Sequence, residues 1–137
     1  MRLVLDTNVL VSVLLTPGGT SDRALRAAVS FGANFLYDAR MLAEYRAVLS
    51  RPKFRAVIAP PMIEQLVSGL IATGEKIAAL PADPGLPDPD DLPFLEVALT
   101  GRADALVTGN ARHFHASHGV TVVSPSGLLK LLVVQRD

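Results

Sequence analysis

Short apolar runs alternate along the chain with segments whose apolar residues recur at helical spacing. The run Leu3–Leu5 predicts a strand, and the spacing of Val9, Leu10, Val13 and Leu14 predicts a helix directly after it. Further strands are expected at 34–37, 76–80, 105–108 and 121–123. Five further helices are expected: one containing Ala24–Val29, then Met41–Leu49, Pro60 to Leu70, Leu92–Thr100, and one containing Leu128–Leu132. Ser21 or Asp22 is expected to cap the first of these helices and Asp38 the second, and Ser124 and Pro125 are expected to start the last.

This alternation predicts the fold class. Strands that alternate with helices form a parallel sheet with helices on both faces. We therefore expect an α/β fold, a three-layer α/β/α sandwich around a central parallel sheet with the common strand order 3-2-1-4-5. Because the sequence contains no internal repeat and no linker, a single domain is expected to span residues 1–137.

Composition narrows the setting of the protein. The 13 basic residues balance the 13 acidic ones, and there is no cysteine, so disulfides and thiolate metal sites are excluded. No apolar run approaches the roughly 18 residues of a membrane span, and an acid already stands at position 6, where a secretory signal would still be apolar. We expect a cytoplasmic protein without membrane contact. The charge balance means that any nucleic acid must be held by a local basic patch or through bound cations.

Polar side chains follow two strands that are expected to be neighbours. Asp6 stands at the carboxyl end of the first strand, and Asn110 lies just beyond the fourth. In an open parallel sheet, ligands bind beyond the carboxyl ends of the strands, where the strand order reverses. Strands one and four adjoin in the expected order, so Asp6 and Asn110 should face the same crevice.

Two helices are expected to add carboxylates to this crevice. Glu44 borders the apolar face of the helix 41–49, from which it can reach the edge of the sheet. Asp91 precedes the buried-face residue Phe94 by one helical turn and projects to the same side, whereas Asp90 is turned away by about 100°. We therefore select Asp91 for the site, with Asp90 as its main rival.

Carboxylates gathered in one crevice favour a particular kind of ligand. Three of them repel one another, and a hard cation removes this repulsion. Mg²⁺ and Mn²⁺ prefer oxygen ligands, and such ions activate a water and polarise a phosphodiester. A bound cation would also offset the repulsion between an acidic pocket and a phosphate backbone.

Each acidic candidate also has a purely structural interpretation. Asp6 and Asp91 can cap the helices that follow them, since aspartate is common at that position. Glu44 can instead form an exposed ion pair with Arg40 or Arg46. The sequence leaves these alternatives open.

The neutral candidates are open to similar alternatives. Asn110 can shape a turn, and Thr7 and Thr108 are either ordinary strand-end hydroxyls or donors that orient carboxylates. Three histidines match no compact zinc signature and are expected to contact a phosphate sooner than a metal: His113, His115 and His118.

Four segments together resemble the motifs of PIN domains. Leu5–Val9 resembles the opening motif, and Glu44–Leu49 with Arg51–Phe54 resembles the second acidic motif and its tail. Asp88–Leu95 resembles the third motif, and Val107–Asn110 resembles the fourth. Their order and spacing match across nearly the whole chain. The best match is the subgroup of stand-alone bacterial PIN proteins, VapC-like ribonucleases, described as the toxins of toxin–antitoxin pairs.

The resemblance implies a function and a site. It implies an endoribonuclease that hydrolyses RNA phosphodiester bonds with Mg²⁺ or Mn²⁺, with Asp6, Glu44 and Asp91 as metal ligands and Asn110 as the fourth catalytic residue. It also implies a homodimer and a small antitoxin protein that blocks the site. The chain departs from the family at Asn110, where many members carry an acid, and this change lowers the charge of the site.

Two other functions compete with this interpretation. Phosphatases of the haloacid-dehalogenase type also place an aspartate after the first strand, but they require a second one two residues later, where this chain has Asn8. The other alternative is a catalytically weak or inactive PIN-like protein that binds RNA or acts as a scaffold, with Asn110 marking the lost activity.

Overall fold

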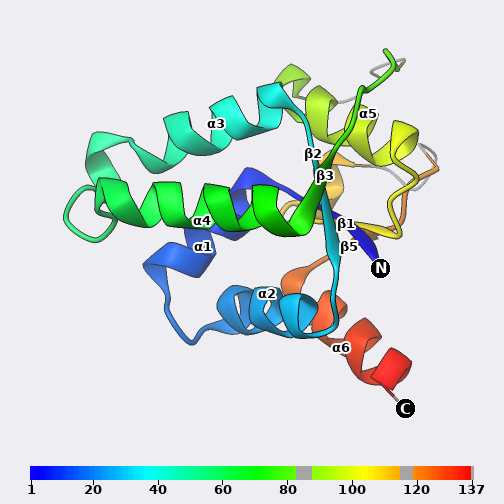
Figure 1. The fold of residues 1–137 in the computed structure, drawn as a ribbon, viewed down its shortest axis with the longest axis horizontal. Helices are drawn as coiled ribbons and strands as arrows, with labels where there is room; N and C mark the ends of the chain where they lie inside the picture. Colours follow the sequence, from blue (N-terminus) through cyan, green and yellow to red (C-terminus); the bar gives the residue numbers. More distant parts are fainter. Residues whose placement is uncertain (83–87, 115–118, 137) are drawn as a thin grey trace.

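The sheet of the protein has five parallel strands in the order β3-β2-β1-β4-β5 (Figure 1). The computed structural model describes residues 1–82, 88–114 and 119–136. Its strands are β1 (Arg2–Leu5), β2 (Asn34–Tyr37), β3 (Gly74–Lys76), β4 (Ala105–Val107) and β5 (Val122–Val123). The predicted strand order is confirmed. Leu3–Leu5 of β1 and all three residues of β4 are buried, which explains why both segments are continuous apolar runs in the sequence.

Helices cover both faces of this sheet. They are α1 (Thr7–Leu15), α2 (Thr20–Ser30), α3 (Ala39–Leu49), α4 (Pro60–Thr73), α5 (Leu92–Thr100) and α6 (Pro125–Arg136), with short 3₁₀ turns η1 (Pro52–Phe54), η2 (Pro89–Asp91) and η3 (Ala111–His113). On one face, α5 packs on β1, β2 and β4; on the other, α4 packs on β2 and β3, and α2 packs against α6 (Figure 1). The predicted α/β fold is confirmed. Within the described residues, none of the helices combines the length and apolar character needed to span a lipid bilayer.

The helix α3 is fixed close to the point where β1 ends. It packs against α1, α4 and α5. Its first turn is capped by Asp38, which accepts a hydrogen bond from the Met41 amide at 3.0 Å, as the sequence predicts. The hydroxyl of the buried Tyr45 donates to the carbonyl oxygen of Leu5 at 2.6 Å. This bond ties the middle of α3 to the carboxyl end of β1.

The third strand lies earlier in the chain than predicted. The expectation of a strand at 76–80 is wrong, because β3 begins at Gly74, directly where α4 ends. A Cβ atom on Gly74 would lie 2.1 Å from the carbonyl oxygen of Phe35 and 2.5 Å from that of Leu70, so only glycine lets helix and strand meet here. Glu75 and Lys76 are exposed at the edge of the sheet, so this strand lacks the apolar run by which a strand is predicted from sequence.

The start of α2 also differs from the prediction. The helix begins at Thr20 with Gly19 as its N-cap, so capping by Ser21 or Asp22 is wrong. The carboxylate of Asp22 instead accepts a hydrogen bond from the amide of Gly18 at 2.8 Å and so stabilises the turn before the helix.

Candidate active site

Asp6 lies buried at the junction of β1 and α1, with 6% of its surface exposed. One carboxylate oxygen accepts a hydrogen bond from the amide of Thr7 at 2.8 Å. The other accepts from the hydroxyl of Thr108 at 2.7 Å and from the side-chain amide of Asn8 at 3.1 Å. Burial raises the pKa of Asp6 above its ordinary value, although these hydrogen bonds act in the opposite direction. Asp6 therefore caps α1, as the structural interpretation held, and its second oxygen faces β4.

Thr108 and Asn8 join the ends of β1 and β4 around this carboxylate. The fully buried hydroxyl of Thr108 donates to Asp6 and accepts from the amide of Asn110 at 3.0 Å. The side chain of Asn8 also accepts from the amide of Gly109 at 2.9 Å. Thr108 thus contacts a carboxylate, in agreement with one of its two interpretations. The role of Asn8 was not predicted, although its place two residues after Asp6 in the same turn is the signal for it.

Glu44 is held beside Asp6 by Thr7. The Thr7 hydroxyl donates to the Glu44 carboxylate, while the Thr7 amide binds Asp6, so one residue contacts both acids. The ion pairs suggested for Glu44 are wrong: Arg40 pairs with Asp38 and Glu96, and Arg46 pairs with Glu64. Burial raises the pKa of Glu44, and repulsion from Asp6 adds to this effect.

Asp91 is buried and its neighbour Asp90 is exposed, as the helical phasing predicts. In the described structure, the side chain of Asp91 makes no capping hydrogen bond to α5. Its carboxylate lies 3.1 Å from Nδ1 of His113. Burial and then repulsion from Asp6 and Asp88 raise the pKa of Asp91 to about 6. This carboxylate is therefore a buried acid whose charge the surrounding protein opposes.

Asn110 and His113 follow β4 on the same side of the sheet. Asn110 is exposed and lines a small hollow of about 150 Å³ with Asn8 and Ser12. The contact of His113 with Asp91 was not predicted. The sequence pattern predicted a loop for this segment, whereas residues Ala111–His113 form the turn η3. His115 and His118 lie outside the described residues.

The chemical type of these side chains suits a hard cation. Burial raises the pKa of Asp6, Glu44 and Asp91, and Asp6 repels the other two. A cation relieves this cost, and its preferred ligands are carboxylate oxygens. In the described part of the chain, however, no three acidic, histidine or cysteine side chains gather closely enough to ligate one ion together. Mg²⁺ is commonly held through one or two carboxylates and several waters. The ion shared by the three acids stays a prediction.

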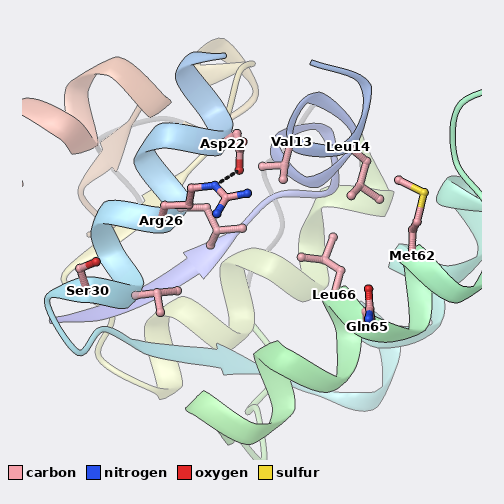
Figure 2. Close-up of a pocket in the computed structure, with 10 residues that line it drawn as sticks. Val13, Leu14, Asp22, Arg26, Ser30, Met62, Gln65 and Leu66 are labelled. Carbon is pink, nitrogen blue, oxygen red and sulfur yellow. Dashed lines mark hydrogen bonds and ion pairs between the residues drawn. The ribbon is translucent and has the colours of Figure 1, made fainter. Parts of the chain in front are cut away.

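A second feature is an open apolar groove between α2 and α4, lined also by Val13 and Leu14 of α1 and not by any of these carboxylates (Figure 2). The groove has a volume of about 610 Å³. Asp22 and Arg26, which form an ion pair with 2.9 Å between Oδ1 and Nε, line one side of it. A smaller hollow of about 200 Å³ continues it, and the two share Leu25, Val29, Gln65 and Leu66. Val29 is 50% exposed, so the groove presents apolar surface to solvent.

Comparison with known proteins adds a family and a set of similar folds. The profile of the family described as PIN domain matches residues 2–112. No curated protein matches the chain.

Three solved structures resemble this protein in fold. Their sequence identity to this chain is below 20%, so the likeness concerns the fold alone. VapBC2 from Rickettsia felis, bound to a DNA fragment from its promoter, has a TM-score of 0.60 and 16% identity, covering 90% of this chain and 98% of that one. VapBC-1 from nontypeable Haemophilus influenzae has a TM-score of 0.58 and 16% identity, covering 92% and 99%. FitAB bound to an IR36 DNA fragment has a TM-score of 0.60 and 19% identity, covering 90% and 94%.

The raised pKa of Asp91 predicts how stability responds to pH. A carboxyl group whose pKa rises from 3.8 to about 6 on folding stabilises the protein below the lower value and loses that contribution as pH rises through the higher one. Asp91→Asn should therefore raise the free energy of unfolding at pH 7.5 by about 1–2 kcal/mol in metal-free buffer. This gain should shrink as pH falls from 7 to 5.

Denaturant unfolding in the presence of EDTA measures both effects. Glu64→Gln serves as the control for removing a carboxylate, because Glu64 is exposed on α4. A variant Asp91→Asn that is less stable than wild type at pH 7.5 would show that the carboxylate is not under electrostatic strain.

Proposed function

Because this chain belongs to the PIN domain family, we propose that it is a metal-dependent endoribonuclease that hydrolyses the phosphodiester bonds of RNA. One observation carries the proposal: Thr7 forms hydrogen bonds with both Asp6 and Glu44, and repulsion from Asp6 adds to burial in raising the pKa of Glu44 and of Asp91, so both acids lie near Asp6 at the carboxyl end of β1. In the described residues, none of the three pairs with a lysine or arginine. A set of buried acids of this kind suits a divalent cation and a reaction on a phosphate.

Each side chain of the proposed site would have its own role. Asp6 and Asp91, with Glu44, would hold Mg²⁺ or Mn²⁺. Such an ion, when bound, would supply an activated water and polarise the phosphodiester. The three hydrogen bonds to Asp6 fix both of its oxygens, so this carboxylate is oriented before any ligand arrives. The hydroxyl of Thr7 holds Glu44 beside it.

Asn110 takes the place at which many members of the family carry an acid. Its backbone is held by Thr108, and its exposed side chain offers one carbonyl oxygen and one amide group. We assign it the orientation of a water or of a phosphate oxygen, which a neutral amide performs without adding charge.

A basic patch accounts for attraction of RNA by a chain with no net charge. Arg51, Lys53 and Arg55 are exposed within and beside η1, directly after α3. None of them forms an ion pair in the described part of the structure. Because phosphate contacts supply most of the affinity for nucleic acids, we assign this patch to the RNA backbone.

Substitution of Asp6 tests the activity. Asp6→Asn keeps the size of the side chain and should lower Mn²⁺-dependent cleavage of RNA by about a hundredfold or more, because it removes a charged ligand. Cleavage of a labelled single-stranded RNA by purified protein measures the effect. Asp22→Asn is the matched control, since Asp22 is also buried but lies at the groove.

The same assay separates the competing interpretations. Equal cleavage by wild type and Asp6→Asn would reveal a contaminating nuclease and contradict the proposal. Binding of RNA without cleavage in Mg²⁺ and in Mn²⁺ would support the alternative of a non-catalytic RNA-binding protein, which the neutral Asn110 favours.

Charge reversal tests the basic patch. In the Asp6→Asn background, Lys53→Glu with Arg55→Glu should weaken RNA binding about tenfold at low salt and reduce the salt dependence by roughly 0.7 per lost phosphate contact. Fluorescence anisotropy across salt concentrations measures both. The control reverses two exposed charges elsewhere, Arg23→Glu with Lys130→Glu. If both double variants lose the same affinity, overall charge and not the patch binds RNA.

The apolar groove between α2 and α4 is assigned to a protein partner. The three similar folds are VapBC and FitAB complexes, and the resemblance in sequence implies a small antitoxin. We propose that an amphipathic segment of such a protein covers the groove, because its exposed apolar residues lie in one continuous hollow. The homodimer implied by the resemblance stays a prediction.

A pair of valines tests this partner site. Val29→Asp places a charge in the groove and should weaken capture of a small protein encoded by a neighbouring gene at least tenfold. Val57→Asp is the matched control, because Val57 is 53% exposed and Val29 is 50% exposed, and Val57 lies outside the groove. Co-purification followed by calorimetry measures the affinity. Equal binding by both variants would place the partner elsewhere.

A further inference from the structure

His113 covers the buried carboxylate of Asp91. Its Nδ1 lies 3.1 Å from an oxygen of Asp91, and 41% of the histidine side chain is exposed, against 12% for the aspartate. The imidazole is therefore the more exposed member of the pair. Asp6 also lies within reach of the charge on this ring. His113 thus lies beside two of the three acids, although the sequence motifs did not include it.

The backbone fixes the position of this imidazole. The turn η3 is closed by a hydrogen bond from the His113 amide to the carbonyl of Asn110 at 2.9 Å, and another runs from the Phe114 amide to Ala111 at 3.1 Å. Phe114, the next residue, is buried in the core. A buried aromatic side chain directly after His113 holds the turn against the protein, so the contact with Asp91 does not depend on a freely moving segment.

The three carboxylates differ in how they are oriented. Asp6 accepts three hydrogen bonds and Glu44 accepts one from Thr7. For Asp91, the contact with His113 is the one side-chain hydrogen bond found within residues 1–82, 88–114 and 119–136. A carboxylate with a single partner takes its orientation from that partner.

We propose that His113 is the positioning residue of Asp91, donating a hydrogen bond from Nδ1 that holds the carboxylate in the orientation needed to bind a divalent ion. The role in metal binding rests on the function proposed above, whereas the pairing of the two side chains does not. A histidine that donates from Nδ1 is locked in one tautomer, with its proton on that nitrogen. In this chain, a residue one turn beyond Asn110 thus supports the third acid.

Three substitutions at His113 separate donation from simple packing. His113→Asn places an amide nitrogen near the position of Nδ1, whereas His113→Gln places it near Nε2 and His113→Ala removes it. We expect Mn²⁺ binding, followed by electron paramagnetic resonance, to weaken 10–100-fold in the Gln and Ala variants. The Asn variant should stay within about threefold of wild type, because it restores the donor. Arg112→Ala, in the same exposed turn, is the control.

The tautomer of His113 provides a readout that needs neither metal nor activity. Nitrogen NMR of the metal-free protein should show the proton of the neutral ring on Nδ1 in wild type and its shift to Nε2 in Asp91→Ala, which removes the acceptor. A wild-type proton on Nε2, or three His113 variants that all bind Mn²⁺ like wild type, would overturn the positioning role. A wild type that binds no Mn²⁺ but keeps its proton on Nδ1 would overturn the metal part of the proposal while upholding the pairing.

Discussion

The structure depends on holding the carboxylate of Asp6 inside the protein at the point where β1 ends. Burial opposes the charge of this group, and three hydrogen bonds from Thr7, Asn8 and Thr108 offset that cost. Since Thr108 lies directly beyond β4, the same bonds that satisfy the acid also join the two central strands. The joining of these two strands and the orientation of the Asp6 carboxylate therefore have one physical origin.

The other acids reach this point by different means. Tyr45 anchors α3 to the carbonyl of Leu5, and Thr7 then holds Glu44, so this acid is fixed by the helix on which it lies. Asp91 comes from the start of α5 and is held by His113, a residue of the turn after β4. The acids and their partners therefore come from the junction of β1 and α1, from α3, from η2 and from η3. Without a counter-charge, this group of acids is less stable than neutral side chains of the same shape would be.

Much of this arrangement follows from the sequence, and the exceptions have identifiable reasons. Periodicity places Asp91 on the buried side and Asp38 at the start of α3, because helical phase and capping are local properties. The strand β3 was misplaced because it is short, polar and begins at Gly74, whose need for glycine arises from contact with Phe35 of another strand. His113 was missed for a similar reason: its partner Asp91 lies far away in the sequence, and nothing local in the turn indicates the contact.

The placement of the basic residues has a geometric consequence for how a nucleic acid would be cut. Glu44 lies in the middle of α3, and the patch of Arg51, Lys53 and Arg55 follows the end of the same helix. Because a helix advances by about 1.5 Å per residue and does not stretch, α3 fixes the separation between Glu44 and the basic residues after its end. Under the proposed function, the number of residues in this helix would set the offset between the bound part of the RNA and the cleaved bond.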